Sequence, residues 1–167
     1  IPNKMLRPFA NTNLFELVLS KLLKSKVIPK QNIIASVYED ELKEIANNLN
    51  VNTYNRSYES ANNEYVIKVN GCSPLLKIET IDKFIQQFIK QKEENLFGAI
   101  ETKDYYWNKE GKLITPWPKN QTIMNTKAVE TTYKAAHVLY ASRMDLIKNN
   151  MFMGDFQKKG GIKLYPM

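Results

Sequence analysis

Apolar residues in the first hundred positions change repeatedly between helical spacing and short continuous runs. Three segments with apolar residues on one helical face are predicted as helices: residues 13–25, 40–50 and 79–93. Short apolar runs around them are predicted as strands: residues 33–37, 51–56, 65–69 and 96–100. Because strands and helices alternate, this half of the chain is expected to form right-handed β–α–β units with a mostly parallel sheet.

Two of these helices allow finer expectations. The first has Asn13 or Thr12 as its N-terminal cap and Glu16 in its first turn. The third is expected to turn five apolar residues toward the sheet: Ile78, Ile81, Ile85, Phe88 and Ile89.

The pattern changes after Glu101. Three aromatic residues, Tyr105-Tyr106-Trp107, precede a turn signal at residues 109–112, and Pro116-Trp117-Pro118 prevents a helix. Residues 102–132 are therefore predicted as an irregular arm inserted in the sheet, with residues 1–101 and 133–167 forming the main α/β domain. The aromatic residues either mark an interface or cover the parent domain. Beyond the arm we expect a strand, a short helix and a last strand: residues 134–141, 143–149 and 162–165.

Composition places the chain among globular proteins. Of its 167 residues, 43% are hydrophobic and 25% are charged, which argues against disorder and coiled coil. No apolar run approaches the roughly 20 residues that cross a membrane. Cys72 is the only cysteine, so a disulfide framework is excluded and the cytoplasm is the expected location. The net charge of +7 fits an anionic partner, or simply scattered, solvated lysines.

Candidate chemistry concentrates after the predicted strand at residues 65–69. Asn70-Gly71-Cys72-Ser73-Pro74 follows it, and the carboxyl ends of strands line the ligand crevice of open α/β sheets. Ser73 and the backbone amides there can face a ligand, or the segment is only a tight turn. Cys72 has no local basic neighbour, which argues against a nucleophile. His137, the single histidine, is either packed on its strand or a catalytic base.

Other motifs are missing or weak. The sequence has no glycine-rich dinucleotide fingerprint, no P-loop and no D-x-D pair, and its aspartates are isolated. It therefore assembles no local metal site. Lys4 and Arg7 precede a helix, and cations beside a helix N-terminus can form a phosphate site.

Several of these pieces, in this order, resemble the cytidylyltransferases that make CMP-activated acidic sugars, the acylneuraminate type. The resemblance rests on six segments: I-P-N-K-M-L-R-P-F at 1–9, I-I-A-S-V-Y-E-D-E-L-K-E-I-A at 33–46, V-N-G-C-S-P-L-L at 69–76, Asn125-Thr126 with Tyr133 and His137, L-I-K-N-N-M-F-M at 146–153, and I-K-L-Y-P-M at 162–167. In the family these segments correspond to the phosphate loop, the second strand and helix, the cytosine and ribose segment, the sugar block, and the closing helix and strand.

The resemblance implies a three-layer, Rossmann-like nucleotidyltransferase sheet whose inserted arm joins two copies into a homodimer through Tyr105, Tyr106 and Trp107. It implies an enzyme that joins CTP to a sialic-acid-like 2-keto-3-deoxy sugar acid and releases pyrophosphate, with Mg²⁺ as cofactor. The implied nucleotide-binding residues are Lys4 (also catalytic, by offsetting phosphate charge), Arg7, Ser36, Asn70, Cys72 and Ser73. The implied sugar-binding residues are Asn125, Thr126, Tyr133, His137 and Phe152.

The sequence also departs from the family pattern, at Met5, Asn70 and Ala136. The first strand, the arginine-bearing half of the phosphate loop and a magnesium-binding D-x-D are missing. We therefore expect that the sequence omits parts of the natural protein. A protein that consisted of these residues alone is expected to lack catalytic activity. The alternative hypothesis is a basic α/β module that binds RNA or a protein partner through the aromatic arm, without catalysis. A sugar-nucleotide glycosyltransferase, the third hypothesis, would require a D-x-D.

Overall fold

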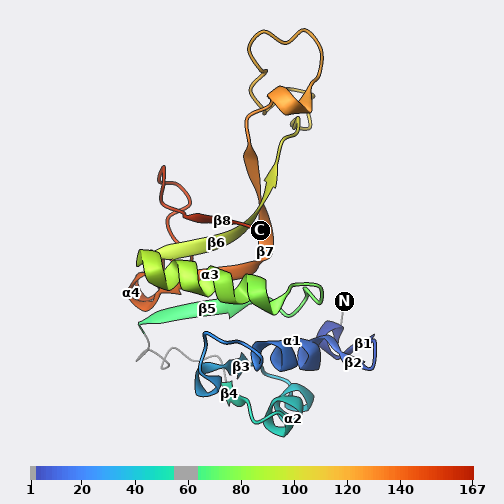
Figure 1. The fold of residues 1–167 in the computed structure, drawn as a ribbon, viewed down its shortest axis with the longest axis vertical. Helices are drawn as coiled ribbons and strands as arrows, with labels where there is room; N and C mark the ends of the chain where they lie inside the picture. Colours follow the sequence, from blue (N-terminus) through green and yellow to red (C-terminus); the bar gives the residue numbers. More distant parts are fainter. Residues whose placement is uncertain (1–2, 55–63) are drawn as a thin grey trace.

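The computed structural model describes residues 3–54 and 64–167 (Figure 1). The N-terminal part contains eight short elements: η1 (Lys4–Leu6), β1 (Pro8–Phe9), β2 (Thr12–Asn13), α1 (Leu14–Leu22), η2 (Lys30–Asn32), β3 (Ile34–Ser36), α2 (Asp40–Asn48) and β4 (Asn52–Tyr54). The predicted cap of the first helix is confirmed, because the Asn13 side chain accepts a hydrogen bond of 2.8 Å from the Glu16 amide. The predicted strand at 51–56 is described only as far as Tyr54, and the polar stretch after it lies outside the described residues.

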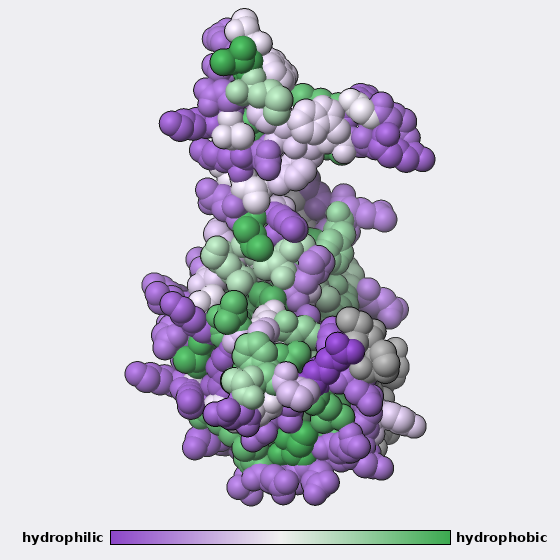
Figure 2. Space-filling model, turned by 90° about the vertical axis from the view of Figure 1, so that its right-hand side faces the viewer, coloured by the Kyte–Doolittle hydropathy of each residue, from purple (hydrophilic) through white to green (hydrophobic). Residues whose placement is uncertain are grey.

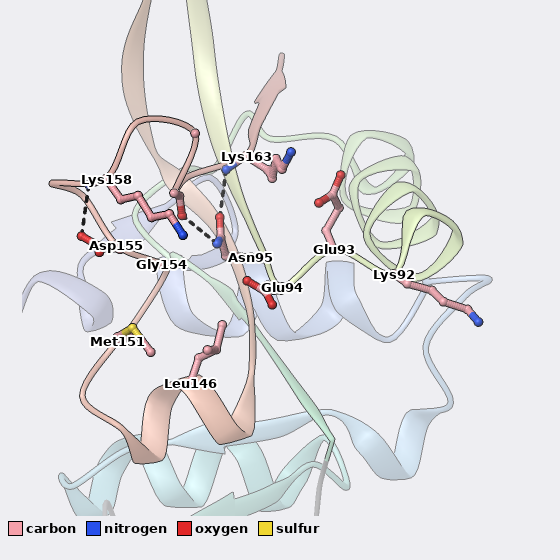
Figure 3. Close-up of a pocket in the computed structure, with 12 residues that line it drawn as sticks. Lys92, Glu93, Glu94, Asn95, Leu146, Met151, Gly154, Asp155, Lys158 and Lys163 are labelled. Carbon is pink, nitrogen blue, oxygen red and sulfur yellow. Dashed lines mark hydrogen bonds between the residues drawn. The ribbon is translucent and has the colours of Figure 1, made fainter.

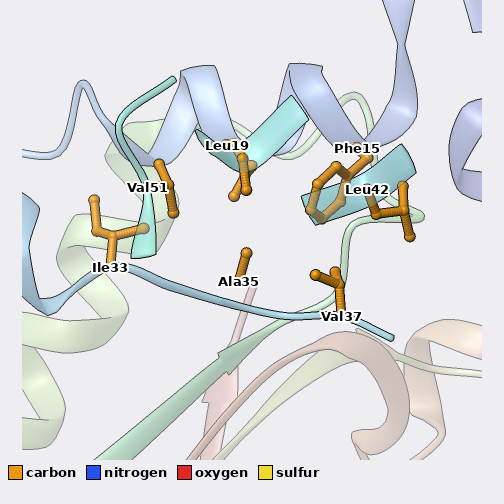
Figure 4. Close-up of a cluster of buried hydrophobic side chains, with 8 residues drawn as sticks. Phe15, Leu19, Ile33, Ala35, Val37, Leu42 and Val51 are labelled. Carbon is orange, nitrogen blue, oxygen red and sulfur yellow. The ribbon is translucent and has the colours of Figure 1, made fainter. Parts of the chain in front are cut away.

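A first hydrophobic core joins these elements. β3 and β4 pair in parallel, with Ala35 opposite Thr53. Side chains from α1, α2 and the strand segment 33–37 meet above this pair, and Figure 4 shows them converging: Phe15, Leu19, Ile33, Ala35, Val37, Leu42, Ala46 and Val51. The strand and the two helices that the alternation predicted are thus confirmed in this part of the chain, although α1 buries Phe15 and Leu19, which the helical spacing did not single out.

The larger sheet follows residue 64. Its elements are β5 (Tyr65–Val69), α3 (Ile78–Gln91), β6 (Asn95–Thr102), η3 (Thr126–Ala128), β7 (Thr132–Arg143), α4 (Met144–Lys148) and β8 (Leu164–Pro166). The strand order is β5-β7-β6-β8. β7 is antiparallel to both β5 and β6, whereas β8 is parallel to β6. Three strands therefore share one direction, and β7 runs against them because the chain returns through the arm. The α/β class with a Rossmann-like central sheet is confirmed.

Helix α3 packs against this sheet and forms the second core. Its buried residues are Ile81, Phe84, Ile85 and Phe88, which contact Leu96, Leu139 and Ala141 of the strands. The prediction for Ile89 is wrong, because that side chain is 58% exposed. Phe84 was not predicted to point inward, and it is fully buried with its ring edge against Tyr165 at 5.3 Å.

Residues 103–131 form an arm that projects from the ends of β6 and β7 (Figure 1). Trp107 bridges Leu113 across the predicted turn, and Asn108 holds the turn through its side-chain oxygen. Tyr105 packs against Trp107 and Trp117 inside the arm, at ring distances of 6.1 and 5.5 Å. It is only 4% exposed, so the expectation that Tyr105 contacts a second copy is wrong. The irregular arm is therefore observed where the proline and aromatic pattern placed it.

Candidate functional site

The candidate site begins at the turn that follows β5. Met5 of η1 packs on this turn: its sulfur lies 3.9 Å from Cys72 Sγ, and a Cβ added to Gly71 would overlap the Met5 methyl group. Lys4 is exposed and directly precedes Met5, so the backbone of η1 at Lys4 lies close to residues 70–73. A separation of these two segments would have excluded a shared nucleotide cradle, and the structure brings them together.

A lysine of α1 holds the turn from the other side. Lys21 Nζ donates a 2.8 Å hydrogen bond to the Pro74 carbonyl oxygen. Partial burial lowers the pKa of Lys21 through desolvation of its charged form. The sequence analysis missed this contact because the two residues are 53 positions apart.

Asn70 links the turn to strand β7. Its side-chain oxygen accepts from the Cys72 amide at 3.0 Å, and its side-chain nitrogen donates to the His137 carbonyl oxygen at 3.0 Å. Its backbone amide donates to the Val138 carbonyl oxygen at 2.8 Å. An asparagine side chain has two N–H groups and two lone pairs, so one donor and one acceptor site remain for a ligand.

His137 occupies a bulge in β7. The register shifts there, since Phe97 pairs with Tyr140 whereas Ala99 pairs with Ala135. His137 has φ of 58°, a left-handed conformation that is unusual for a non-glycine residue and is found preferentially at functional positions. Its side chain is exposed, and its Nδ1 lies 3.3 Å from the Tyr140 hydroxyl. The bulge therefore presents the imidazole outside the regular sheet pattern.

Aromatic rings surround His137 on this face of the sheet. Phe97 lies at ring distances of 4.8 Å from Tyr140, 6.5 Å from His137 and 6.3 Å from Phe156. Phe97, Tyr133 and Phe156 also line an open apolar cavity of about 180 Å³. Two implied sugar-binding residues, Tyr133 and His137, are thus connected through Phe97.

Phe152 reaches this group through a lysine. Lys68 Nζ lies 5.8 Å from the centre of the Phe152 ring and 5.9 Å from that of Tyr140. Burial raises the pKa of Tyr140, which keeps its hydroxyl protonated as a hydrogen-bonding group. The sequence analysis did not identify Lys68, Phe97 and Tyr140 as site residues. The one signal that could have pointed to Lys68 is its position as a lysine within an apolar strand.

Three implied site residues lie elsewhere. Ser36 is the exposed last residue of β3, paired with Tyr54. Asn125 and Thr126 lie in the arm, where the Asn125 amide donates to the Tyr105 hydroxyl at 3.0 Å. Figure 1 shows the arm well away from β5. A single chain does not bring these two residues to His137, and their roles remain predictions, as do those of the exposed Arg7 and of Ser73.

A second cavity, larger than the one beside Phe97, lies at another end of the sheet. It measures about 420 Å³ and surrounds the start of β6 and the loop at 154–161 (Figure 3). Asn95 fixes this loop by donating to the Gly161 carbonyl oxygen and accepting from the Lys163 amide, both at 2.9 Å. Its walls carry equal numbers of lysines and carboxylates, so its charge favours neither anions nor cations: Lys92, Lys158, Lys163, Glu93, Glu94 and Asp155.

Two further properties concern metals and membranes. Within residues 3–54 and 64–167, no three histidine, cysteine or carboxylate side chains gather as a metal-binding group. In the same residues, no helix has the length and apolar character needed to span a bilayer.

The fold defines a domain of the nucleotidyltransferase type. It combines the α/β sheet, the N-terminal segment around Met5 that packs on the turn after β5, and the inserted arm. A family model described as cytidylyltransferase matches residues 52–165, more than half of the chain. The chain therefore belongs to the cytidylyltransferase family and is a nucleotidyltransferase. This membership favours an enzyme over the non-catalytic binding module.

Solved structures share the fold at low sequence identity. A CMP:2-keto-3-deoxy-manno-octonic acid synthetase complexed with CTP is 12% identical, with a TM-score of 0.65 over 90% of this chain and 71% of that one. A cytidylyltransferase from Leptospira borgpetersenii is 15% identical (TM-score 0.64; 100% and 70% covered). A 4-diphosphocytidyl-2C-methyl-D-erythritol synthase from Anaerococcus prevotii is 18% identical (TM-score 0.64; 96% and 81% covered). No curated protein matches the chain.

Proposed function

We propose that this cytidylyltransferase joins CTP to a 2-keto-3-deoxy sugar acid of the sialic type, giving a CMP-sugar and pyrophosphate. The contact of Met5 with Gly71 and Cys72 carries the proposal, because it places the cationic segment around Lys4 beside the turn after β5. The acylneuraminate-type segments quoted above support the choice of acceptor.

The nucleotide would lie over this turn. Lys4 and Arg7 are exposed cations that would neutralise the triphosphate, and Lys4 directly precedes Met5, which packs on the turn. The unused donor and acceptor of Asn70, together with Cys72 and Ser73, would recognise cytosine and ribose. Ser36, at the end of β3, is proposed as a further contact.

The acceptor would lie toward His137. The imidazole, the Tyr140 hydroxyl and the Phe152 ring offer polar and apolar contacts to a sugar. Tyr133 borders the adjacent apolar cavity. Asn125 and Thr126 would contribute from the arm of a second copy.

The reaction is an in-line displacement at phosphorus. The anomeric oxygen of the sugar forms a bond to the α-phosphorus, and the bond from that phosphorus to the bridging oxygen breaks, releasing pyrophosphate. The hydroxyl proton is lost to solvent or to a nearby base. Catalysis then consists mainly of positioning the two substrates and neutralising the phosphate charge. Lys4 would supply the charge neutralisation.

Mg²⁺ is proposed on the basis of the family resemblance. Mg²⁺ prefers oxygen ligands, and the substrate phosphates would supply some of them.

A homodimer through the arm is also proposed. Exposed apolar side chains gather on the arm, at Ile114, Ile123 and Met124, beside the exposed faces of Trp107 and Trp117. Such a surface on a projecting element favours a protein contact. A location in the cytoplasm remains a prediction from the single cysteine.

The test is pyrophosphate release from CTP with a panel of acceptors: N-acetylneuraminate, 2-keto-3-deoxy-manno-octonate and 2C-methyl-D-erythritol 4-phosphate, each with Mg²⁺. Release with a sugar acid, and not with ATP in place of CTP, supports the proposal. Release only with the phosphorylated alditol would overturn the acceptor assignment. No release with any acceptor, together with no rise in melting temperature on adding CTP, would overturn the function.

A further inference from the structure

We propose that Lys68 forms an anion subsite on the sheet face beside His137 and that this subsite takes the carboxylate of the acceptor. The inference deepens the proposed function and rests on it for the identity of the acceptor. The geometry itself is independent of the reaction.

Two aromatic rings hold the position of Lys68. In the register of β5 and β7, Lys68 lies directly opposite Tyr140. Its ammonium group lies 5.9 Å from the centre of that ring and 5.8 Å from the centre of the Phe152 ring. A cation within about 6 Å of a ring centre is attracted to its face. The flexible lysine is therefore held between a strand residue and a residue of the segment that follows α4.

Strand alternation explains why this lysine is solvent-facing. Ile67 and Val69 pack against the core beneath α3, so Lys68 points to the opposite face of the sheet. Its side chain is exposed, whereas Tyr140 is only 9% exposed. The ammonium group thus stands on a buried aromatic floor and remains open to a ligand.

No protein carboxylate neutralises this charge in the described part of the chain. The ion pairs found there involve Lys43, Lys109 and Arg143, and none includes Lys68. A positioned cation without a counter-ion, beside the buried Tyr140 ring, favours an anion. The nearby polar groups, the Tyr140 hydroxyl and the His137 imidazole, can add hydrogen bonds to such an anion.

The neighbouring surface favours a carboxylate carried by a sugar over a free phosphate. Phe97 joins Tyr140 to the apolar cavity of about 180 Å³ that Phe156 and Tyr133 also line. A single lysine beside apolar walls suits a singly charged group on a carbon skeleton, whereas triphosphate sites gather several cations. On the face of the molecule that Figure 2 shows, hydrophobic residues lie on the body below the arm among hydrophilic residues.

The test compares Lys68→Gln and Lys68→Arg with Lys134→Gln, which removes the same charge from an exposed position of β7 outside the site. Binding of N-acetylneuraminate and of 2-keto-3-deoxy-manno-octonate is measured by titration calorimetry on the full chain with a non-hydrolysable CTP analogue. The carboxamide of N-acetylneuraminate is the uncharged probe. Binding of the CTP analogue itself is measured separately, and melting temperatures check folding.

We expect Lys68→Gln to weaken binding of at least one sugar acid about tenfold or more, while Lys68→Arg retains most of it. The wild type should prefer the acid to its carboxamide, and Lys68→Gln should lose this preference. Affinity for the CTP analogue should change less than twofold. Equal loss in Lys134→Gln, an unchanged preference for the acid, or no binding of either acid by the wild type would overturn the subsite. If the wild type does not bind the CTP analogue, the proposed function is overturned instead.

Discussion

The side-chain nitrogen of Asn70 donates a 3.0 Å hydrogen bond to the carbonyl oxygen of His137. This bond joins the turn after β5 to the bulge of β7, and the same asparagine also fixes the Cys72 amide. The proposed nucleotide and acceptor sides of the site therefore share one residue, and a change at Asn70 should affect both sides.

Asn70→Asp tests this link. The aspartate keeps an acceptor for the Cys72 amide but loses the donor to His137, and its oxygen would face the His137 carbonyl oxygen. Loss of one such bond costs on the order of 1 kcal/mol, or about fivefold in binding. We expect both KM values, measured by pyrophosphate release, to rise about fivefold or more, that of the acceptor because the bond to His137 is lost and that of CTP because the unused donor of Asn70 is lost as well. Asn47→Asp, on the exposed face of α2, is the matched control for added charge. A rise of the CTP KM with an unchanged acceptor KM would contradict the link.

Lys4→Ala tests the phosphate side. Removing this exposed cation beside Met5 should raise the CTP KM more than the acceptor KM, because the triphosphate carries most of the substrate charge. The CTP effect should shrink as salt is added. Arg7→Ala should have a smaller effect, and Lys30→Ala, in η2, serves as the control. Parallel increases of both KM values would show that Lys4 has no specific role at the nucleotide.

Local pattern predicted much of the fold, whereas long-range contacts escaped it. The caps, the apolar runs and the Pro116-Trp117-Pro118 signal depend on neighbours in sequence, and the structure has the first cap, the strands and the arm as expected. Helical spacing alone does not show which residues of α3 face the sheet. It predicted Ile89 as an inward residue, whereas the structure buries Phe84 instead. The antiparallel course of β7 follows from the return through the arm, which periodicity does not record.

The same difference between local and long-range information explains which parts of the site were predicted. The turn at residues 70–73 was predicted because it follows a strand, a rule that needs only local sequence. Its contacts with Met5 and His137 span more than 60 positions and required the fold. Lys68 was overlooked because the sequence of a single strand does not show the residue paired with it, and only the pairing with Tyr140 shows what lies beside Lys68.

Asp145 provides a pH-dependent prediction. Hydrogen bonds from the Arg143 guanidinium, one of them 3.0 Å long, hold the pKa of this carboxyl below its usual value of 3.8. A lowered folded-state pKa stabilises the protein above pH 3.8, and this contribution is lost as the pH falls toward the folded-state value. Asp145→Asn should therefore lower the melting temperature slightly at pH 7, because the pair is exposed, and the difference from wild type should vanish in acid. Thermal unfolding from pH 7 to pH 2 checks this, with Glu44→Gln as control. A difference that persists unchanged at pH 2 would contradict the ionic origin.

Two substitutions on α3 test which of its residues pack against the sheet. Phe84 is fully buried and its ring meets Tyr165 of β8, so Phe84→Ala should leave a cavity between helix and sheet. Such a change costs about 3–5 kcal/mol of unfolding free energy. Ile89 is largely exposed, and Ile89→Ala should change stability by less than about 0.5 kcal/mol. Urea unfolding followed by circular dichroism gives both values. Because alanine favours helix at each position, a difference between the variants reports burial rather than helix propensity. Comparable losses in the two variants would show that Ile89 also faces the core.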